Sequence, residues 1–134
     1  MVAWQNASMR GRAESGWWGT VLDAPDARSL ADFYARLLGW KVRKYEPEWA
    51  TVSPAEGVAY LGFQTSPEYV APEWPPVEGR QQMMMHLDIE VDDLDAAVVD
   101  ATELGATLAA FQPQDDVRVM LDPVGHPFCL YRGE

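Results

Sequence analysis

Three polar side chains recur at alternate positions of one short segment. His86, Asp88 and Glu90 are separated from one another by single aliphatic residues. Because successive side chains of a strand point to opposite faces, this spacing predicts a strand with all three on one face. A carboxylate in partly apolar surroundings can act as a general base, and a histidine can carry the proton. The simpler interpretation is that Glu90, like Asp23 at the matching position of the first half, reaches solvent or pairs with Arg118.

Cys129 is the single cysteine of the chain. A thiol close to a histidine can become an activated thiolate, which is a nucleophile. A free cysteine more often fills space as a small buried side chain, and no third residue that would orient His86 is evident from the sequence. Both interpretations of Cys129 stay open.

The elements that would position these residues occur twice. Landmarks of the first half return in the second at a nearly constant separation and in the same order: Asp26 with Asp93, Leu38-Gly39 with Leu104-Gly105, Pro54 with Pro123, and Gly57 with Gly125. An aspartate suits the start of a helix and a glycine its end. The repeat predicts two copies of one βαβββ unit.

The expected elements follow from the apolar periodicity between these landmarks. The first half has a strand before Asp26, a helix ending at Leu38, and strands at 40–44, 48–53 and 58–64. The second half has a strand at 84–91, a helix at 94–104, and strands at 107–111, 117–121 and 127–132. The fold class is therefore α+β.

The same pattern divides the chain. We expect a flexible segment at 1–16, then one domain at 17–134 with module one at 17–64, a linker at 65–83 and module two at 84–132. The linker contains four prolines together with Tyr69 and Trp74. It is either a stiff connector or a flap that lays these two aromatic residues over a binding site.

The net charge of −11 comes from 21 acidic and 10 basic residues. Affinity for nucleic acids depends on Lys and Arg that neutralise phosphates, so neither nucleic acid nor an anionic membrane is an expected partner. A neutral or cationic small molecule suits this charge better. A lone cysteine and the lack of a long apolar run predict a cytoplasmic protein without disulfides.

Three motifs resemble those of the vicinal oxygen chelate superfamily, which includes glyoxalase I, extradiol dioxygenases and bleomycin-resistance proteins. They are the helix and its end at 30–40 (LADFYARLLGW), the strand and helix entry at 86–94 (HLDIEVDDL), and the hairpin at 122–130 (DPVGHPFCL). The resemblance covers residues 17 to 132. It implies two mixed sheets that form a curved cup with the helices outside, and it implies a homodimer.

Strand alternation and the repeat together predict which side chains face this cup. They give an aromatic floor with a charged rim, which suits a flat organic ligand. The expected ligand-binding residues are Trp17, Val21, Asp23, Trp49, Thr51, Phe63, Arg118, Met120 and Tyr131, with Tyr69 and Trp74 from the linker.

The resemblance also implies where a metal would be held. Metal-dependent members place four ligands at positions that correspond to Gly19, Leu61, His86 and Cys129. Gly19 and Leu61 have no ligating side chain, and a catalytic metal usually takes at least three protein ligands. We therefore expect neither a metal nor another cofactor.

The sequence favours metal-independent binding of an aromatic small molecule, for sequestration or sensing. A first alternative is a metal-independent lyase or isomerase that uses His86 with Asp88, Glu90 or Cys129. A second is an interaction module whose cup has collapsed onto its own side chains.

Overall fold

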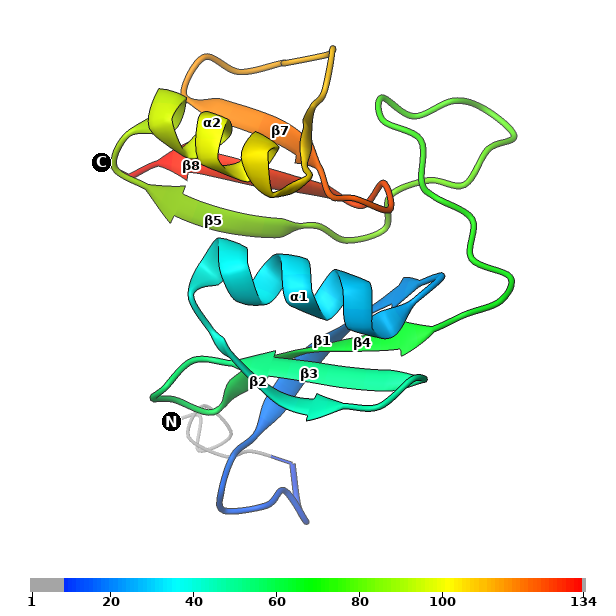
Figure 1. Ribbon diagram of the computed structural model, residues 1–134, viewed down its shortest axis with the longest axis vertical. Coiled ribbons are helices and arrows are strands. Elements are labelled where there is room, and N and C mark those ends of the chain that lie inside the picture. The colour runs from blue at the N-terminus through cyan, green and yellow to red at the C-terminus, as the bar shows by residue number, and fades with distance from the viewer. Residues whose placement is uncertain (1–8, 134) are drawn as a thin grey trace, which may run out of the picture.

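The computed structural model describes residues 9–133 and contains two similar modules (Figure 1). Of the expected segment at 1–16, residues 1–8 lie outside the described part. The first module comprises β1 (Trp18–Ala24), α1 (Ala27–Leu38), β2 (Lys41–Tyr45), β3 (Trp49–Ser53) and β4 (Ala59–Thr65). The second comprises β5 (Leu87–Val91), α2 (Leu94–Leu104), β6 (Thr107–Leu108), β7 (Val117–Leu121) and β8 (Pro127–Arg132). The α+β class with two βαβββ modules is confirmed.

The helix ends lie where the sequence predicts them. Asp26 Oδ1 accepts a hydrogen bond from the Arg28 amide at 3.1 Å, and Asp93 Oδ1 accepts one from the Ala96 amide at 3.1 Å. Gly39 ends α1 in a left-handed conformation with φ of 68°. A side chain would be strained there, which explains the glycine. The repeated aspartate and glycine in the sequence therefore mark the start and the end of each helix.

The two sheets have the same topology. Their strand orders are β1-β4-β3-β2 and β5-β8-β7-β6, and β1 with β4 and β5 with β8 are the parallel pairs. Each helix covers one face of its own sheet. We call the other face, which carries Tyr60 and Gly62 in the first sheet and Asp88 and Cys129 in the second, the open face of that sheet.

The core joins the two modules through α1, which lies between the first sheet and β5 (Figure 1). The ring of Tyr34 stacks on Phe63 with centroids 5.7 Å apart and meets Phe128 edge-on at 6.1 Å. Its hydroxyl donates to Asp122 at 2.7 Å. One α1 residue therefore contacts β4, β8 and the turn before β8.

Phe63 and Met120 lie in this core, whereas the sequence placed both on the cup side. Each is fully buried. In β4 the core takes Leu61 and Phe63, so Tyr60 and Gly62 face the open side. In β7 the expected parity is inverted: Met120 pairs with Phe128 and Arg118 with Leu130, and both partners are core residues. A shift of one residue moves every side chain of a strand to the other face, and β7 has apolar residues on both.

The strand β6 has two residues instead of the five expected. The Gln112 side chain takes the place of further strand pairing, because its Oε1 accepts from the Val119 amide and its Nε2 donates to the Val119 carbonyl, both at 2.8 Å. The first strand of module two is also shorter than predicted. It begins at Leu87, so His86 lies just before it.

Two aromatic side chains of the linker are hydrogen-bonded to the second module. Tyr69 donates from its hydroxyl to the Val124 carbonyl at 2.8 Å. Trp74 donates from Nε1 to the Phe111 carbonyl at 3.2 Å, and its ring lies 6.0 Å from that of Phe111. Neither described helix combines the length and the apolar character needed to cross a membrane.

Candidate functional site

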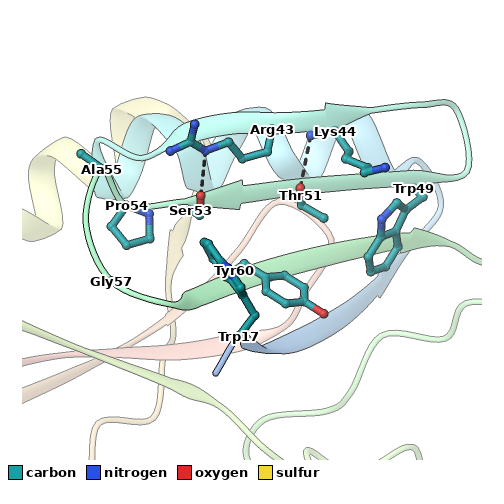
Figure 2. A pocket seen from close by; sticks show the side chains of 10 residues that line it. All are labelled: Trp17, Arg43, Lys44, Trp49, Thr51, Ser53, Pro54, Ala55, Gly57 and Tyr60. Atoms are coloured by element: carbon teal, nitrogen blue, oxygen red, sulfur yellow. Dashed lines mark hydrogen bonds between the residues drawn. The ribbon is translucent and has the colours of Figure 1, made fainter. Parts of the chain in front are cut away.

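The open face of the first sheet holds a cavity of about 580 Å³ (Figure 2). Its lining combines aromatic, cationic and hydroxyl side chains with the turn that joins β3 to β4. We call it the aromatic cavity, and its lining residues are Trp17, Arg43, Lys44, Trp49, Thr51, Ser53, Pro54, Ala55, Gly57 and Tyr60.

Two glycines make the aromatic floor possible. A Cβ added to Gly62 would lie 2.5 Å from the Trp49 ring, and one added to Gly19 would collide with the ring of Tyr60. Each ring therefore lies against bare backbone of β4 or β1. Glycine within a strand often marks such a close approach. The rings of Trp17 and Tyr60 are tilted at 50°, with centroids 6.5 Å apart.

The hydroxyls of β3 form the polar side of the cavity. Ser53 Oγ accepts from Arg43 Nε at 2.9 Å, and Thr51 Oγ1 accepts from the Lys44 amide at 3.2 Å. Thr51 and Ser53 are buried, so these bonds satisfy groups that would otherwise be costly to remove from water. They also hold β2 at a fixed position beside the cavity.

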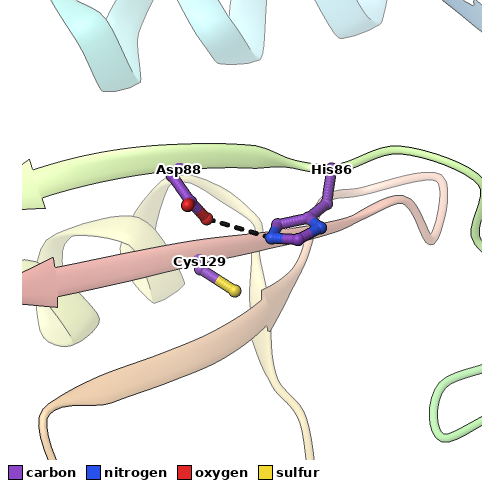
Figure 3. Close-up of side chains that lie close together, drawn as sticks. All are labelled: His86, Asp88 and Cys129. Atoms are coloured by element: carbon purple, nitrogen blue, oxygen red, sulfur yellow. Dashed lines mark ion pairs between the residues drawn. The ribbon is translucent and has the colours of Figure 1, made fainter.

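The open face of the second sheet carries a separate cluster (Figure 3). His86 Nε2 lies 3.0 Å from Asp88 Oδ1, and Cys129 stands on the neighbouring strand opposite Asp88. The ligand atoms of all three lie within 4.8 Å of one another. Asp88 is thus the residue that orients His86, which the sequence did not reveal.

The thiol of Cys129 is a poor nucleophile in this setting. Partial burial raises the pKa of Cys129, and the nearby Asp88 carboxylate raises it further by its charge and by a hydrogen bond. Both causes favour the neutral thiol over the thiolate that nucleophilic catalysis needs. The pair of His86 and Asp88 is still a candidate general base.

The four-ligand metal centre implied by the family resemblance does not fit this chain. The ring of Tyr60 covers Gly19, and Leu61 is buried in the core. The first module therefore offers no ligand at its two positions. Among the described residues, a group that could hold an ion is formed by His86, Asp88 and Cys129, which lie just before β5, in β5 and in β8, and zinc accepts all three types.

The other predicted site residues are dispersed. Val21, Asp23 and Tyr69 line a second cavity of about 440 Å³, where His126 Nε2 lies 2.6 Å from the Asp23 carbonyl oxygen. Glu90 and Tyr131 pair farther along the second sheet. Arg118 donates to backbone carbonyls of 114, 115 and 117 near the start of α2.

The structure brings together Trp17, Trp49 and Thr51 of the predicted ligand-binding set. Sequence reasoning missed Arg43, Lys44, Ser53 and Tyr60, which line the same cavity. The signals that could have indicated them were a glycine in the middle of β4 and two adjacent cations in a five-residue strand.

The family model of the glyoxalase-like domain matches residues 19–131. The chain belongs to the glyoxalase-like domain family. The expected kinship with the vicinal oxygen chelate superfamily is thereby confirmed. The match spans both modules of this glyoxalase-like domain, including β1, β4, β5 and β8. No curated protein matches its sequence.

Solved structures share the fold of this glyoxalase-like domain at low sequence identity. A glyoxalase/bleomycin resistance protein/dioxygenase family enzyme from Burkholderia phytofirmans PsJN has a TM-score of 0.62 and 19% identity, covering 85% of this chain and 95% of that one. The bleomycin-binding protein of Streptomyces verticillus has 0.57 and 19%, covering 88% and 96%. TnmS3, an antibiotic binding protein from Streptomyces sp. CB03234, has 0.50 and 18%, covering 87% and 96%. Identities this low show the fold alone.

Proposed function

We propose that this protein binds an aromatic small molecule in the aromatic cavity, for sequestration or sensing and without turnover. The observation that carries the proposal is the cavity of about 580 Å³ with Trp17, Trp49 and Tyr60 around it. Its volume lies in the range of small-molecule sites, and its lining has the usual mix of aromatic surface and a few polar groups. The cavity is lined by residues of the first module alone, so it is not the cup between both sheets that the resemblance implied.

Two structural neighbours support this kind of role. One is described as a bleomycin-binding protein and another as an antibiotic binding protein. Their names describe binding as a use of this fold. Because one fold hosts many functions, the cavity itself carries the argument.

The binding that we propose does not depend on a metal. Among the described residues, those that line the aromatic cavity include no His, Cys, Asp or Glu. The cluster of His86, Asp88 and Cys129 belongs to the other sheet. A ligand seated on Trp49 would be held by apolar contact, ring stacking and hydrogen bonds.

The proposal includes a homodimer in the cytoplasm. Trp18, Met84 and Met85 are more than half exposed, and large apolar side chains at the surface are typical of interfaces between chains. The lone Cys129 suits a reducing compartment. Light scattering coupled to size exclusion would measure twice the chain mass of 15.0 kDa for the dimer.

The test is a calorimetric screen of aromatic compounds against the protein and two variants. We expect binding that Trp49→Ala weakens about tenfold or more, because stacking and burial of a large ring are lost. Trp74→Phe, whose ring lies on the linker, should bind as the parent does. EDTA should leave binding unchanged. No binding by any compound, or loss of binding with EDTA, would contradict the proposal.

A second candidate function rests on the 3.0 Å contact between His86 Nε2 and Asp88 Oδ1. Asp88 fixes the ring so that His86 could take a proton from a substrate in a lyase or isomerase reaction. In that case His86→Ala and Asp88→Asn would abolish turnover of a bound compound. Trp49→Ala, on the other sheet, would then leave the proton-transfer step intact.

A further inference from the structure

Two adjacent cations of β2 line the aromatic cavity. In the pairing of β2 with β3, Lys41 lies opposite Ser53, Val42 opposite Val52 and Lys44 opposite Thr51, so Arg43 has no partner. This extra residue is a β-bulge. Without it, Arg43 and Lys44 would point to opposite faces of the sheet. With it, both line the same cavity.

The guanidinium of Arg43 is fixed in place with donors to spare. Its Nε donates to Ser53 Oγ at 2.9 Å, which leaves the two terminal NH₂ groups for another acceptor. Figure 2 shows this guanidinium over Ser53 and the Lys44 ammonium on the side toward Trp49. The two positive groups therefore lie along one edge of the aromatic floor.

Neither cation is neutralised within the described part of the chain. The ion pairs found there join Arg80 to Glu73 and His86 to Asp88. No carboxylate lines the aromatic cavity among residues 9–133. Most basic residues of the described part are likewise unpaired, and Arg43 and Lys44 differ from them because they are adjacent and line the same cavity.

We infer that the ligand of the aromatic cavity is an aromatic anion, such as an aryl carboxylate. Its ring lies on Trp49 and Tyr60, and its negative group accepts hydrogen bonds from Arg43 and Lys44. The inference rests on the proposed function and names the ligand class for that site. It gives the ligand a charge opposite in sign to the one expected from the net charge.

Local charge outweighs net charge here for a physical reason. At physiological salt, charges more than about 8 Å apart are largely screened in solvent. The acidic residues spread over the surface therefore act weakly on a ligand in the cavity. A guanidinium in hydrogen-bond contact with a carboxylate acts strongly, and its planar fork matches the two oxygens.

Three probes of one shape test the inference by calorimetry: 2-naphthoate, its neutral amide 2-naphthamide, and the cation 2-naphthylmethylammonium. We expect 2-naphthoate to bind at least about tenfold more tightly than the amide, the ratio that one charged hydrogen bond supplies. The cation should bind more weakly than the amide.

Variants connect this preference to the two side chains. Arg43→Gln and Lys44→Gln should each weaken 2-naphthoate about tenfold and change 2-naphthamide less than twofold. Arg43→Lys, which keeps the charge, should recover part of the loss. Arg36→Gln removes an exposed charge from α1, on the covered face of the same sheet, and is the control, with no effect beyond twofold on either probe.

The outcomes separate the two claims. Equal binding of the three probes, unchanged in Arg43→Gln and Lys44→Gln, would overturn the inference and leave aromatic binding intact. Binding of none of the probes would contradict the proposed function, and the inference with it. Weakening of both 2-naphthoate and 2-naphthamide by Arg43→Gln, with a lower melting temperature, would show that Arg43 acts only by holding β2 to β3, and this would also overturn the inference.

Discussion

The Tyr34 hydroxyl of α1 donates a hydrogen bond of 2.7 Å to Asp122 Oδ2, which belongs to the turn between β7 and β8 of the other module. Asp122 Oδ1 in turn accepts from the amides of Val124 and His126, each at 3.0 Å. Both residues of the pair are buried. This bond links α1 of the first module to the turn before β8 of the second.

Replacing Tyr34 by phenylalanine should destabilise the protein by about 1–3 kcal/mol, because Asp122 Oδ2 is left buried without its donor. Urea denaturation measures this change in the free energy of unfolding. The control is Tyr45→Phe, which removes a bond of 2.8 Å to Asp32 at an exposed site and should leave the free energy of unfolding almost unchanged. An equal loss of unfolding free energy in the two variants would show that the buried bond between the modules stabilises the protein no more than an exposed one.

The carboxyl of Asp122 should make stability depend on pH. Its burial raises its pKa above the ordinary value of 3.8, although the hydrogen bond from Tyr34 partly opposes this. The folded state therefore holds this proton more tightly than the unfolded state. Its stabilising effect is complete below pH 3.8 and is lost as the pH rises through the raised folded pKa.

The variant Asp122→Asn isolates this effect. The free energy of unfolding of the parent, minus that of the variant, should fall as the pH is raised above about 4 and should then level off. Urea titrations at a series of pH values give this difference directly. A difference that rises with pH over the same range would show that the hydrogen bonds to the ionised carboxylate outweigh its burial.

A methyl group at Gly62 should disturb the cavity floor. The added Cβ of Gly62→Ala would lie 2.5 Å from the Trp49 ring, so the ring must move. We expect a shifted tryptophan emission spectrum and aromatic ligands bound several-fold more weakly, while the protein stays folded by circular dichroism. Unchanged affinity in a folded Gly62→Ala protein would mean that Trp49 does not set the shape of the site.

The thiol of Cys129 should react slowly. Burial and the Asp88 carboxylate raise its pKa, so alkylation by iodoacetamide at pH 7 should be slower than that of a free cysteine. Asp88→Asn should speed the reaction because the charge is gone. Mass spectrometry of the intact chain follows this single site. Fast alkylation at neutral pH would instead support Cys129 as a nucleophile.

The features that could be predicted from the sequence are those that depend on residues close together in the chain. Asp26, Gly39 and Asp93 mark helix ends through requirements of the backbone, and the repeat of these signals identified the two modules. The face on which Asp88 lies was predictable because β5 alternates cleanly. The family resemblance added the fold and the positions where metal ligands are missing.

The rest depended on contacts that alternation cannot determine. In β7, Met120 fills the core, although Val119 and Leu121 make the other face of the strand equally apolar. The two adjacent cations of β2 are a signal, but their spacing alone does not place a bulge at Arg43, where it turns Lys44 toward the cavity. The net charge suggested a neutral or cationic ligand because it averages over the surface, whereas a site responds to the charges beside it.

The most direct test of the account is a crystal structure of the protein with 2-naphthoate. The account predicts density for the naphthalene ring between Trp49 and Tyr60, with the carboxylate within hydrogen-bond distance of Arg43. Density beside His86 and Asp88 on the second sheet, with the aromatic cavity free of ligand, would contradict it.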